Sequence, residues 1–217
     1  MAFIAKPANP SPDTDIELML RTRDGDLGAF QELFARHSES LLEFIARFIG
    51  ERAEAEDLTQ EAFLRVFRAR ERYEAAASFK SYIYRIATNL CLNECRRVST
   101  TRTEPLESHG VVREFPDPRM PAAEELLAGK QAAKRIRAAL DRLPETQRVA
   151  LLLTRGEGLS CREVADILET SESAVKSLVF RATQTLRETL ADLIDNDPRA
   201  FRPRRRHATE APRAACA

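Results

Sequence analysis

The sequence is poor in the residues that break helices or build cross-linked folds. Only 7 of its 217 residues are glycine, and tryptophan is absent. Its four cysteines have no spacing typical of a disulfide framework or a metal site, so neither a metal nor another cofactor is expected. No apolar run approaches the ~20 residues of a membrane span, and the apolar stretch after Met1 is too short for a secretory signal. These absences predict a cytoplasmic protein without membrane insertion.

Leucine, alanine, glutamate and arginine dominate the chain, and all four favour helices. Apolar residues recur at helical spacing in two long stretches, and no stretch alternates as a half-buried strand does. The predicted fold class is therefore all-α, with two small helical domains joined by a flexible linker. The expected parts are a disordered N-terminus at 1–13, a first domain at 14–97, a linker at 98–128, a second domain at 129–194 and an Arg/Pro-rich tail at 195–217.

The formal net charge is zero, with 34 basic and 34 acidic residues, which argues against a nonspecific nucleic-acid binder. The charge is unevenly distributed. Residues 13–97 and 98–128 each carry a net charge of −3, whereas residues 129–190 carry +3. An acidic linker therefore separates a mixed first domain from a mildly basic second one.

The helix predicted around residues 54–68 has one apolar face and one polar face. Its apolar positions, ending at Val66 and Phe67, are expected in the core. The opposite face presents a leucine among polar and acidic groups: Asp57, Gln60, Glu61 and Leu64. Either this is an ordinary solvated face, on which a single exposed leucine is common, or it is a surface for a partner protein.

A further helix is expected from about residue 79 to residue 97, with a net charge of +3 over residues 80–97. One of its stripes combines aromatic, amide and cationic side chains: Tyr82, Arg85, Asn89, Asn93 and Arg96. Aromatic rings stack on unpaired bases, amides bond base edges and arginines hold phosphates. The stripe is therefore either a nucleic-acid contact or a polar helix face with one amphipathic tyrosine.

The second domain has the pattern of a helix-turn-helix. Ser160 and Glu163 fit a capping box at the start of a short helix, a turn is expected at residues 169–171, and a long amphipathic helix follows. The outward face of the long helix offers Ser173, Lys176, Ser177, Phe180 and Arg181. A plain helical bundle is the alternative, whereas a recognition helix in the DNA major groove would use this face for DNA.

Both domains resemble those of sigma-70 factors. In the first domain the resemblance rests on residues 55–63 (AEDLTQEAF) and 79–89 (FKSYIYRIATN). In the second it rests on residues 143–148 (LPETQR), 158–165 (GLSCREVA) and 174–182 (AVKSLVFRA). It covers roughly residues 15–97 and 129–190, and the linker is too short for the intervening domain of a larger sigma factor. That points to the extracytoplasmic-function (ECF) group.

The resemblance implies core RNA polymerase and promoter DNA as partners, and commonly an anti-sigma factor. It assigns polymerase binding to Asp57, Gln60, Glu61 and Leu64. It assigns promoter melting and the downstream element, including a base-capturing loop at residues 73–79, to Tyr73, Ser78, Phe79, Lys80, Tyr82, Arg85, Asn89, Asn93 and Arg96. It assigns the upstream element to Ser171, Ser173, Lys176, Ser177, Phe180 and Arg181.

The chain departs from the family pattern at four positions. Tyr82 stands where tryptophan is usual, and stacking survives that change. Glu169 stands at the usual glycine of the turn, so the turn is expected to be wider or strained. Leu178 and Thr183 replace two cations, which predicts weaker DNA binding or altered specificity.

The expected function is that of a sigma factor, which directs core polymerase to specific promoters and assists initiation. One alternative is a helix-turn-helix regulator that acts without polymerase, which leaves the match of the first domain unexplained. Another is an enzyme with Cys91 or Cys161 as nucleophile. No catalytic histidine signature and no glycine-rich phosphate loop accompany these cysteines, so an enzyme is not expected.

Overall fold

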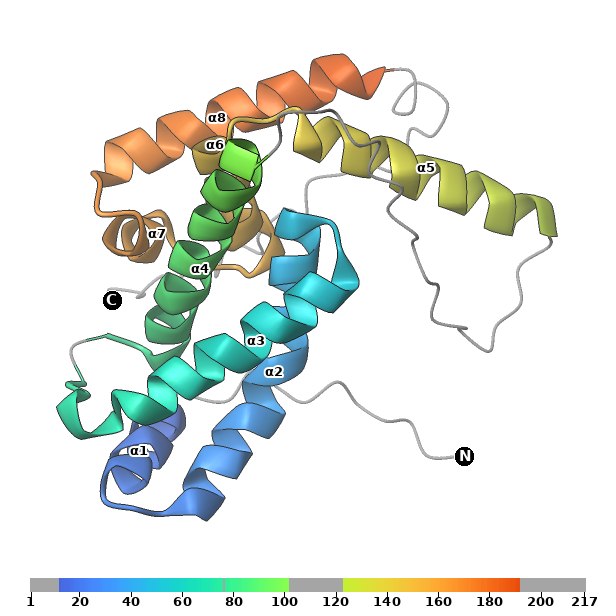
Figure 1. Ribbon diagram of the computed structural model, residues 1–217. Helices are drawn as coiled ribbons and strands as arrows, with labels where there is room; N and C mark the ends of the chain where they lie inside the picture. The colour runs from blue at the N-terminus through green and yellow to red at the C-terminus, as the bar shows by residue number, and fades with distance from the viewer. Residues whose placement is uncertain (1–11, 76, 102–122, 192–217) are drawn as a thin grey trace, which may run out of the picture.

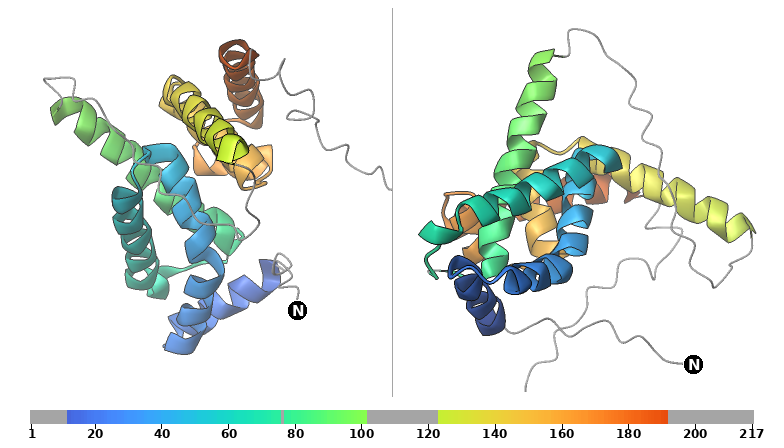
Figure 2. Two further views of the ribbon diagram at one scale, coloured as in Figure 1. Left: turned by 90° about the vertical axis from the view of Figure 1, so that its right-hand side faces the viewer. Right: turned by 60° about the horizontal axis from the view of Figure 1, so that its bottom comes forward.

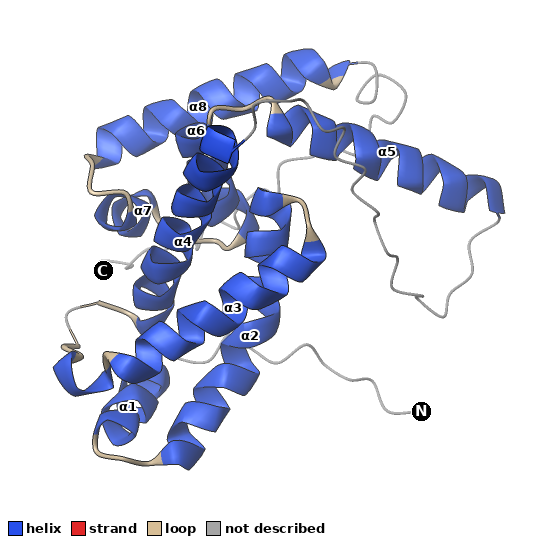
Figure 3. Ribbon diagram, viewed as in Figure 1, coloured by secondary structure: helices blue, strands red, loops and turns tan. Residues whose placement is uncertain are grey.

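The computed structural model describes residues 12–75, 77–101 and 123–191, and in these residues all regular structure is helical (Figures 1 and 3). The all-α prediction is confirmed. The elements are α1 (Pro12–Arg23), α2 (Leu27–Ile49), α3 (Arg52–Arg68), the 3-10 turn η1 (Arg70–Arg72), α4 (Phe79–Thr101), α5 (Ala123–Asp141), α6 (Glu145–Leu151), the π-helical turn η2 (Leu152–Gly156), α7 (Cys161–Ile167) and α8 (Glu172–Thr189). We call α1–α4 the first half and α5–α8 the second half.

Three predicted segments lie wholly or largely outside the described residues. They are the N-terminus at 1–13, the central part of the linker at 102–122, and the tail at 195–217. At the edges of the predicted linker the structure is helical, because α4 continues to Thr101 and α5 begins at Ala123.

Local signals in the sequence account for where α2 begins and ends. The Asp26 side chain accepts a hydrogen bond from the backbone N–H of Ala29 at 3.1 Å, which caps the first turn. The helix stops at Gly50, which has a φ of 94°, a left-handed conformation that favours glycine. Its N–H donates to the carbonyl oxygen of Ala46 at 2.9 Å. A helix of 23 residues results, long enough to contact both halves of the molecule.

The core of the first half forms where α2, α3 and α4 meet. The apolar stripe predicted for α3 is buried, including Ala55, Ala62 and Val66. Phe44 of α2 packs edge-on against Tyr84 of α4 with ring centroids 5.2 Å apart. These contacts orient the remaining faces of α3 and α4 away from the core of the first half.

The second half is built around α6, α7 and α8. The buried stripe of α8, Val175, Val179 and Ala182, packs against α6 and α7. Helix α6 runs directly into η2, where the N–H of Glu157 donates to the carbonyl oxygen of Leu152 at 3.0 Å. The predicted capping box is confirmed, since the Ser160 and Glu163 side chains each bond the other's backbone N–H.

The two halves lie against each other and share one buried core (Figures 1 and 2). Helix α4, green in both figures, contacts α3 on one side and α7 on the other. Arg148 of α6 is buried and stacks on the ring of Phe48 at 4.4 Å, while its guanidinium donates to Asp141 at 2.9 Å. Arg137 of α5 donates to the carbonyl oxygens of Ala46 and Arg47 at the end of α2, at 3.0 and 2.7 Å.

Candidate polymerase and promoter interfaces

The four residues predicted for polymerase binding lie on the outward face of α3. Asp57 and Gln60 are exposed, and 47% of Leu64 is exposed. Glu61 is half-buried and accepts a hydrogen bond from Arg65 at 2.8 Å, which lowers the pKa of its carboxyl group. The structure thus brings these four side chains onto one accessible face.

Two residues predicted to contact the downstream element, Tyr73 and Phe79, are buried in this structure. Tyr73 is 5% exposed and packs edge-on against Tyr82 at 5.3 Å between ring centroids. Phe79 is fully buried beside the His37 ring, 5.2 Å away. Both are large apolar rings at the ends of a loop, and burying them fixes the loop to the core. Tyr82 itself is half-buried, so only part of its ring is open for stacking.

The start of α4 is occupied by contacts that the sequence did not predict. Ser78 caps the helix by accepting a hydrogen bond from the N–H of Ser81 at 3.1 Å. The Lys80 ammonium donates to the carbonyl oxygen of Glu157 at 2.7 Å, and Arg85 donates to the carbonyl oxygen of Asp166 at 2.9 Å. Both cations predicted to contact DNA here therefore bond the second half of the chain.

A buried carboxylate lies at the centre of this contact. The side chain of Glu157 is 8% exposed and accepts a hydrogen bond from the Tyr84 hydroxyl at 2.6 Å. Arg47 lies 3.9 Å from the same carboxylate. Burial raises the pKa of the Tyr84 hydroxyl above its ordinary value, and the charge of Glu157 adds to the effect. Sequence reasoning missed both residues, although a tyrosine within the apolar positions of α4 was a signal that its hydroxyl needs a partner.

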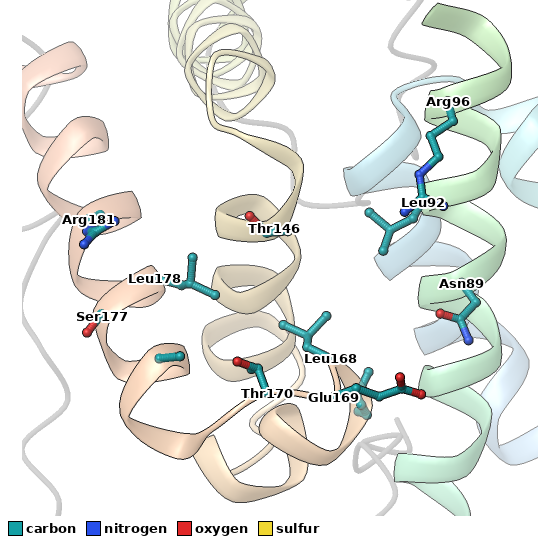
Figure 4. A pocket seen from close by; sticks show the side chains of 12 residues that line it. Asn89, Leu92, Arg96, Thr146, Leu168, Glu169, Thr170, Ser177, Leu178 and Arg181 are labelled. Atoms are coloured by element: carbon teal, nitrogen blue, oxygen red, sulfur yellow. The ribbon is translucent and has the colours of Figure 1, made fainter. Parts of the chain in front are cut away.

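A groove of about 760 Å³ separates α4 from the helix-turn-helix (Figure 4). Asn89, Leu92 and Arg96 of α4 line one wall, and Ser177, Leu178 and Arg181 of α8 line the other. Leu168 and Thr170 lie at the turn between α7 and α8. Residues predicted for the downstream element and residues predicted for the upstream element therefore line one groove. Asn93 is exposed and accepts a long hydrogen bond from Arg96, 3.5 Å between heavy atoms.

The remaining residues predicted for the upstream element lie on the exposed side of α8. Ser171 caps the helix by accepting from the N–H of Ala174 at 3.2 Å, and Ser173 is exposed beside it. Lys176 pairs with Glu172 at 2.6 Å, and this hydrogen bond raises the pKa of the lysine. Phe180 is 69% exposed, the largest exposed fraction among the large apolar side chains that the structure describes. A helix face with an unburied aromatic ring and a cation on either side is a suitable surface for DNA.

The turn before α8 is strained rather than widened. Glu169 has a φ of 52°, in the left-handed region that glycine adopts without cost. The N–H of Thr170 donates to the carbonyl oxygen of Ala165 at 3.0 Å, the bond that ends a helix in a Schellman motif. The turn thus keeps its compact form although a glutamate stands at the glycine position.

The cysteines of the described residues form no disulfide with one another. Cys91 is fully buried, and burial raises the pKa of its thiol, which disfavours the reactive thiolate. Cys95 and Cys161 are half-buried and also free, and Cys216 lies outside the described residues. Over the residues searched, no helix is long and apolar enough to cross a bilayer, and no cluster of three or more potential metal ligands occurs.

Comparison with known proteins places both halves in one family. The family description "Sigma-70 region 2" matches residues 33–101, and "Sigma-70, region 4" matches residues 133–186. The chain belongs to the sigma-70 family of RNA polymerase sigma factors.

Its relatives place this sigma factor in the ECF group. It is 35% identical over 165 residues to the ECF RNA polymerase sigma factor SigE of Mycolicibacterium smegmatis, covering 75% of this chain and 62% of the relative. It is 29% identical over 190 residues to the ECF RNA polymerase sigma-E factor of Escherichia coli, covering 83% of this chain and 96% of the relative.

Solved structures of similar proteins share the fold of this sigma factor. CnrH, in complex with the cytosolic domain of CnrY, matches with a TM-score of 0.62 and 23% identity, over 85% of this chain and 99% of that one. RpoE of Bartonella quintana, in complex with the anti-sigma factor NepR, matches with a TM-score of 0.61 and 22% identity, over 75% of this chain and 96% of that one. Sigma factors are regulators of transcription.

Proposed function

We propose that this sigma factor directs core RNA polymerase to specific promoters through three helical faces. The outward face of α3, with Asp57 and Leu64, docks on polymerase. The polar stripe of α4, from Tyr82 to Arg96, contacts the melted downstream element. The exposed face of α8 reads the upstream element in the major groove.

The observation that carries this assignment is the exposure of large apolar side chains on α3 and α8. The α4 stripe lies along the groove beside α8. On α3 and α8, large apolar side chains are exposed where a soluble helix would bury them: Leu64 on the first and Phe180 on the second. Each is accompanied by charged side chains on the same face. Such mixed surfaces are typical of binding sites, and region 2 and region 4 of the family supply the matching functions.

Promoter binding requires the two halves to move apart. Asn89 and Arg96 of α4 line one groove with Leu178 of α8, and Lys80 and Arg85 bond the second half, so in the closed arrangement the α4 stripe is partly occupied. The outer face of α8, with Lys176 and Phe180, is already exposed, so it is the α4 stripe that promoter binding must free. We therefore assign the structure to the form of the protein that is not bound to promoter DNA.

An anti-sigma factor is the proposed partner of this closed form. The two similar solved structures named above are both complexes, one of them with a protein named as an anti-sigma factor. A partner that spans α4 and α8 would hold the two halves together and keep both DNA-contacting surfaces covered. We infer that this sigma factor acts in the cytoplasm, where its partners core polymerase and promoter DNA are found.

Run-off transcription with core polymerase on a library of genomic fragments tests the proposed function. Discrete transcripts that depend on this protein are expected, and their start points reveal the promoter sequence. Cosedimentation with core polymerase separates this function from that of a regulator acting alone. A protein that shifts promoter fragments but never cosediments with polymerase would favour the regulator.

A further inference from the structure

Two buried polar side chains of the first half belong to none of the proposed binding faces. Asp15 of α1 is 4% exposed and His37 of α2 is 6% exposed. Nε2 of His37 lies 2.8 Å from Oδ2 of Asp15, and the Arg36 guanidinium donates to Oδ1 of the same carboxylate at 2.9 Å. A carboxylate only accepts hydrogen bonds, so Nε2 of His37 carries the hydrogen in this pair. The bond fixes the position and the plane of the His37 ring.

This pair supplies direction rather than hydrophobic stabilisation. Burial lowers the pKa of His37, although the Asp15 carboxylate beside it acts in the opposite direction. Apolar side chains in place of a buried polar or charged pair often leave a protein equally stable or make it more stable. A hydrogen bond, in contrast, requires a narrow range of distances and angles and so selects one orientation of the ring.

The His37 ring belongs to a row of packed rings that includes Tyr82 of the α4 stripe. Phe79, the first residue of α4, is fully buried, and its ring centroid lies 5.2 Å from that of His37. The Phe79 ring lies 6.5 Å from the Tyr82 ring, which packs on Tyr73 at 5.3 Å. Tyr82 is half-buried, so its ring neighbours decide which part of it stays open.

Helix α1 reaches both ring neighbours of Tyr82. It packs against η1, which directly precedes Tyr73, and against α4, which begins at Phe79. Burial raises the pKa of the Tyr73 hydroxyl, and the neighbouring Tyr82 and Asp15 groups add to the effect. Asp15 therefore acts on the Tyr73 side of the row through space and on the Phe79 side through His37.

We propose that Asp15 and His37 are positioning residues for promoter DNA: through Phe79 they orient the Tyr82 ring on which an unpaired base of the downstream element stacks. The inference rests on the proposed contact of the α4 stripe with the melted strand. It adds a role for α1, which carries none of the three proposed binding faces. The pair itself touches no DNA and no polymerase, so its loss alters stacking and leaves the affinity for core polymerase unchanged.

A scan with the fluorescent adenine analogue 2-aminopurine tests this role in the holoenzyme. Core polymerase with this sigma factor binds a pre-melted template, made from a promoter mapped by run-off transcription. The template carries the analogue at one position of the melted region at a time. A base that stacks on an aromatic ring is in direct contact with its π-face, and its emission is quenched. We expect one position that is quenched with the wild type and not with Tyr82→Ala.

Asp15→Asn and His37→Phe are the test variants. The first keeps the volume of the side chain and removes its charge, whereas the second keeps a ring and removes the donor. Each is expected to lose the quenching at the position that Tyr82 controls. Each should also bind the pre-melted template about 5-fold more weakly, the lower end of what one base stacked on an aromatic ring contributes.

Thr22→Val is the matched control. Thr22 is a buried polar residue of the same helix, 1% exposed, and its hydroxyl donates to the carbonyl oxygen of Leu18 at 2.8 Å, within α1. This variant should keep the quenching and the affinity of the wild type, because it leaves the bond between Asp15 and His37 in place. Loss of quenching in Thr22→Val as well would overturn the proposal, since any weakening of α1 would then suffice.

The double variant Asp15→Leu with His37→Phe separates positioning from stability. It leaves no unpaired polar group in the pair, so its melting temperature should return toward that of the wild type while the quenching stays lost. Recovery of both would overturn the proposal, and so would wild-type quenching in both single variants. A loss of affinity for core polymerase that parallels the loss of quenching would also overturn it, in favour of a general folding defect.

The Tyr82→Ala template scan and run-off transcription distinguish this failure from that of the proposed function. If the wild type supports transcription but Tyr82→Ala quenches every position as the wild type does, the assignment of Tyr82 fails and the inference fails with it. If the wild type supports no run-off transcription, the proposed function itself fails.

Discussion

Replacing Glu169 with glycine is expected to stabilise this sigma factor, because the turn between α7 and α8 holds this residue in a left-handed conformation. A residue with a side chain pays about 1–2 kcal/mol for that conformation, and glycine does not. Glycine gains freedom in the unfolded chain, which costs about 0.4–1 kcal/mol. The Glu169 side chain is exposed and makes no hydrogen bond or ion pair with the part of the chain that the structure describes, so no contact is lost. The net gain lies between about 0 and 1.6 kcal/mol, with a middle value of about 0.8 kcal/mol.

Urea unfolding of the wild type, Glu169→Gly, Glu169→Asn and Glu169→Ala measures this effect. The free energy of unfolding should be highest for glycine. Asparagine should follow, because it tolerates the left-handed region better than most residues do. Alanine keeps the strain and loses only the charge, so it should stay within ~0.5 kcal/mol of the wild type. Equal stability of the glycine and alanine variants would refute the argument that backbone strain at residue 169 is significant.

The remaining predictions concern the three proposed interfaces. The double substitution Asp57→Lys with Glu61→Lys should weaken binding to core polymerase in a pull-down titration, with an unchanged melting temperature, because both side chains lie outside the core; equal affinity would remove α3 from the docking surface. Asn89→Ala should impair promoter opening more than duplex binding, by ~1–3 kcal/mol, and a pre-melted template should restore initiation. Lys176→Ala and Arg181→Ala should each cost ~1–3 kcal/mol of upstream binding if the side chain touches a base, or reduce the salt slope by about one if it touches phosphate. Unchanged upstream footprints in both variants would argue against α8 as the reader.

The helices and much of the core could be predicted from the sequence, because helical periodicity is a local signal. Val66 and Ala62 of α3 were expected inside and are buried. The sequence predicted that the turn at Glu169 would be either wider or strained, because glycine at that position of the motif adopts a left-handed conformation. The structure shows the strained form, with a φ of 52° at Glu169. These predictions needed only neighbours in the chain.

The contact between the halves could not be predicted, because it depends on surfaces separated by more than 70 residues. Lys80 and Arg85 have the composition of a DNA-binding stripe, and nothing in their local sequence indicates that carbonyl oxygens of the second half already bind them. The burial of Tyr73 could not be predicted for a similar reason. A loop aromatic can stack on a base or anchor the loop, and only the tertiary structure shows that this one is buried.

The π-helical turn η2 sets the direction in which Glu157, the residue after it, points toward the first half. Its bond from the N–H of Glu157 to the carbonyl oxygen of Leu152 spans five residues, one more than an α-helix would use. Successive residues of an α-helix point about 100° apart. Deleting a single residue between Leu152 and Gly156 would convert the turn to regular helix and rotate Glu157 by about that angle, away from Tyr84. The closed form is therefore sensitive to one insertion or deletion in a segment outside the three proposed binding faces, a route by which related chains can differ in regulation while keeping every proposed binding residue.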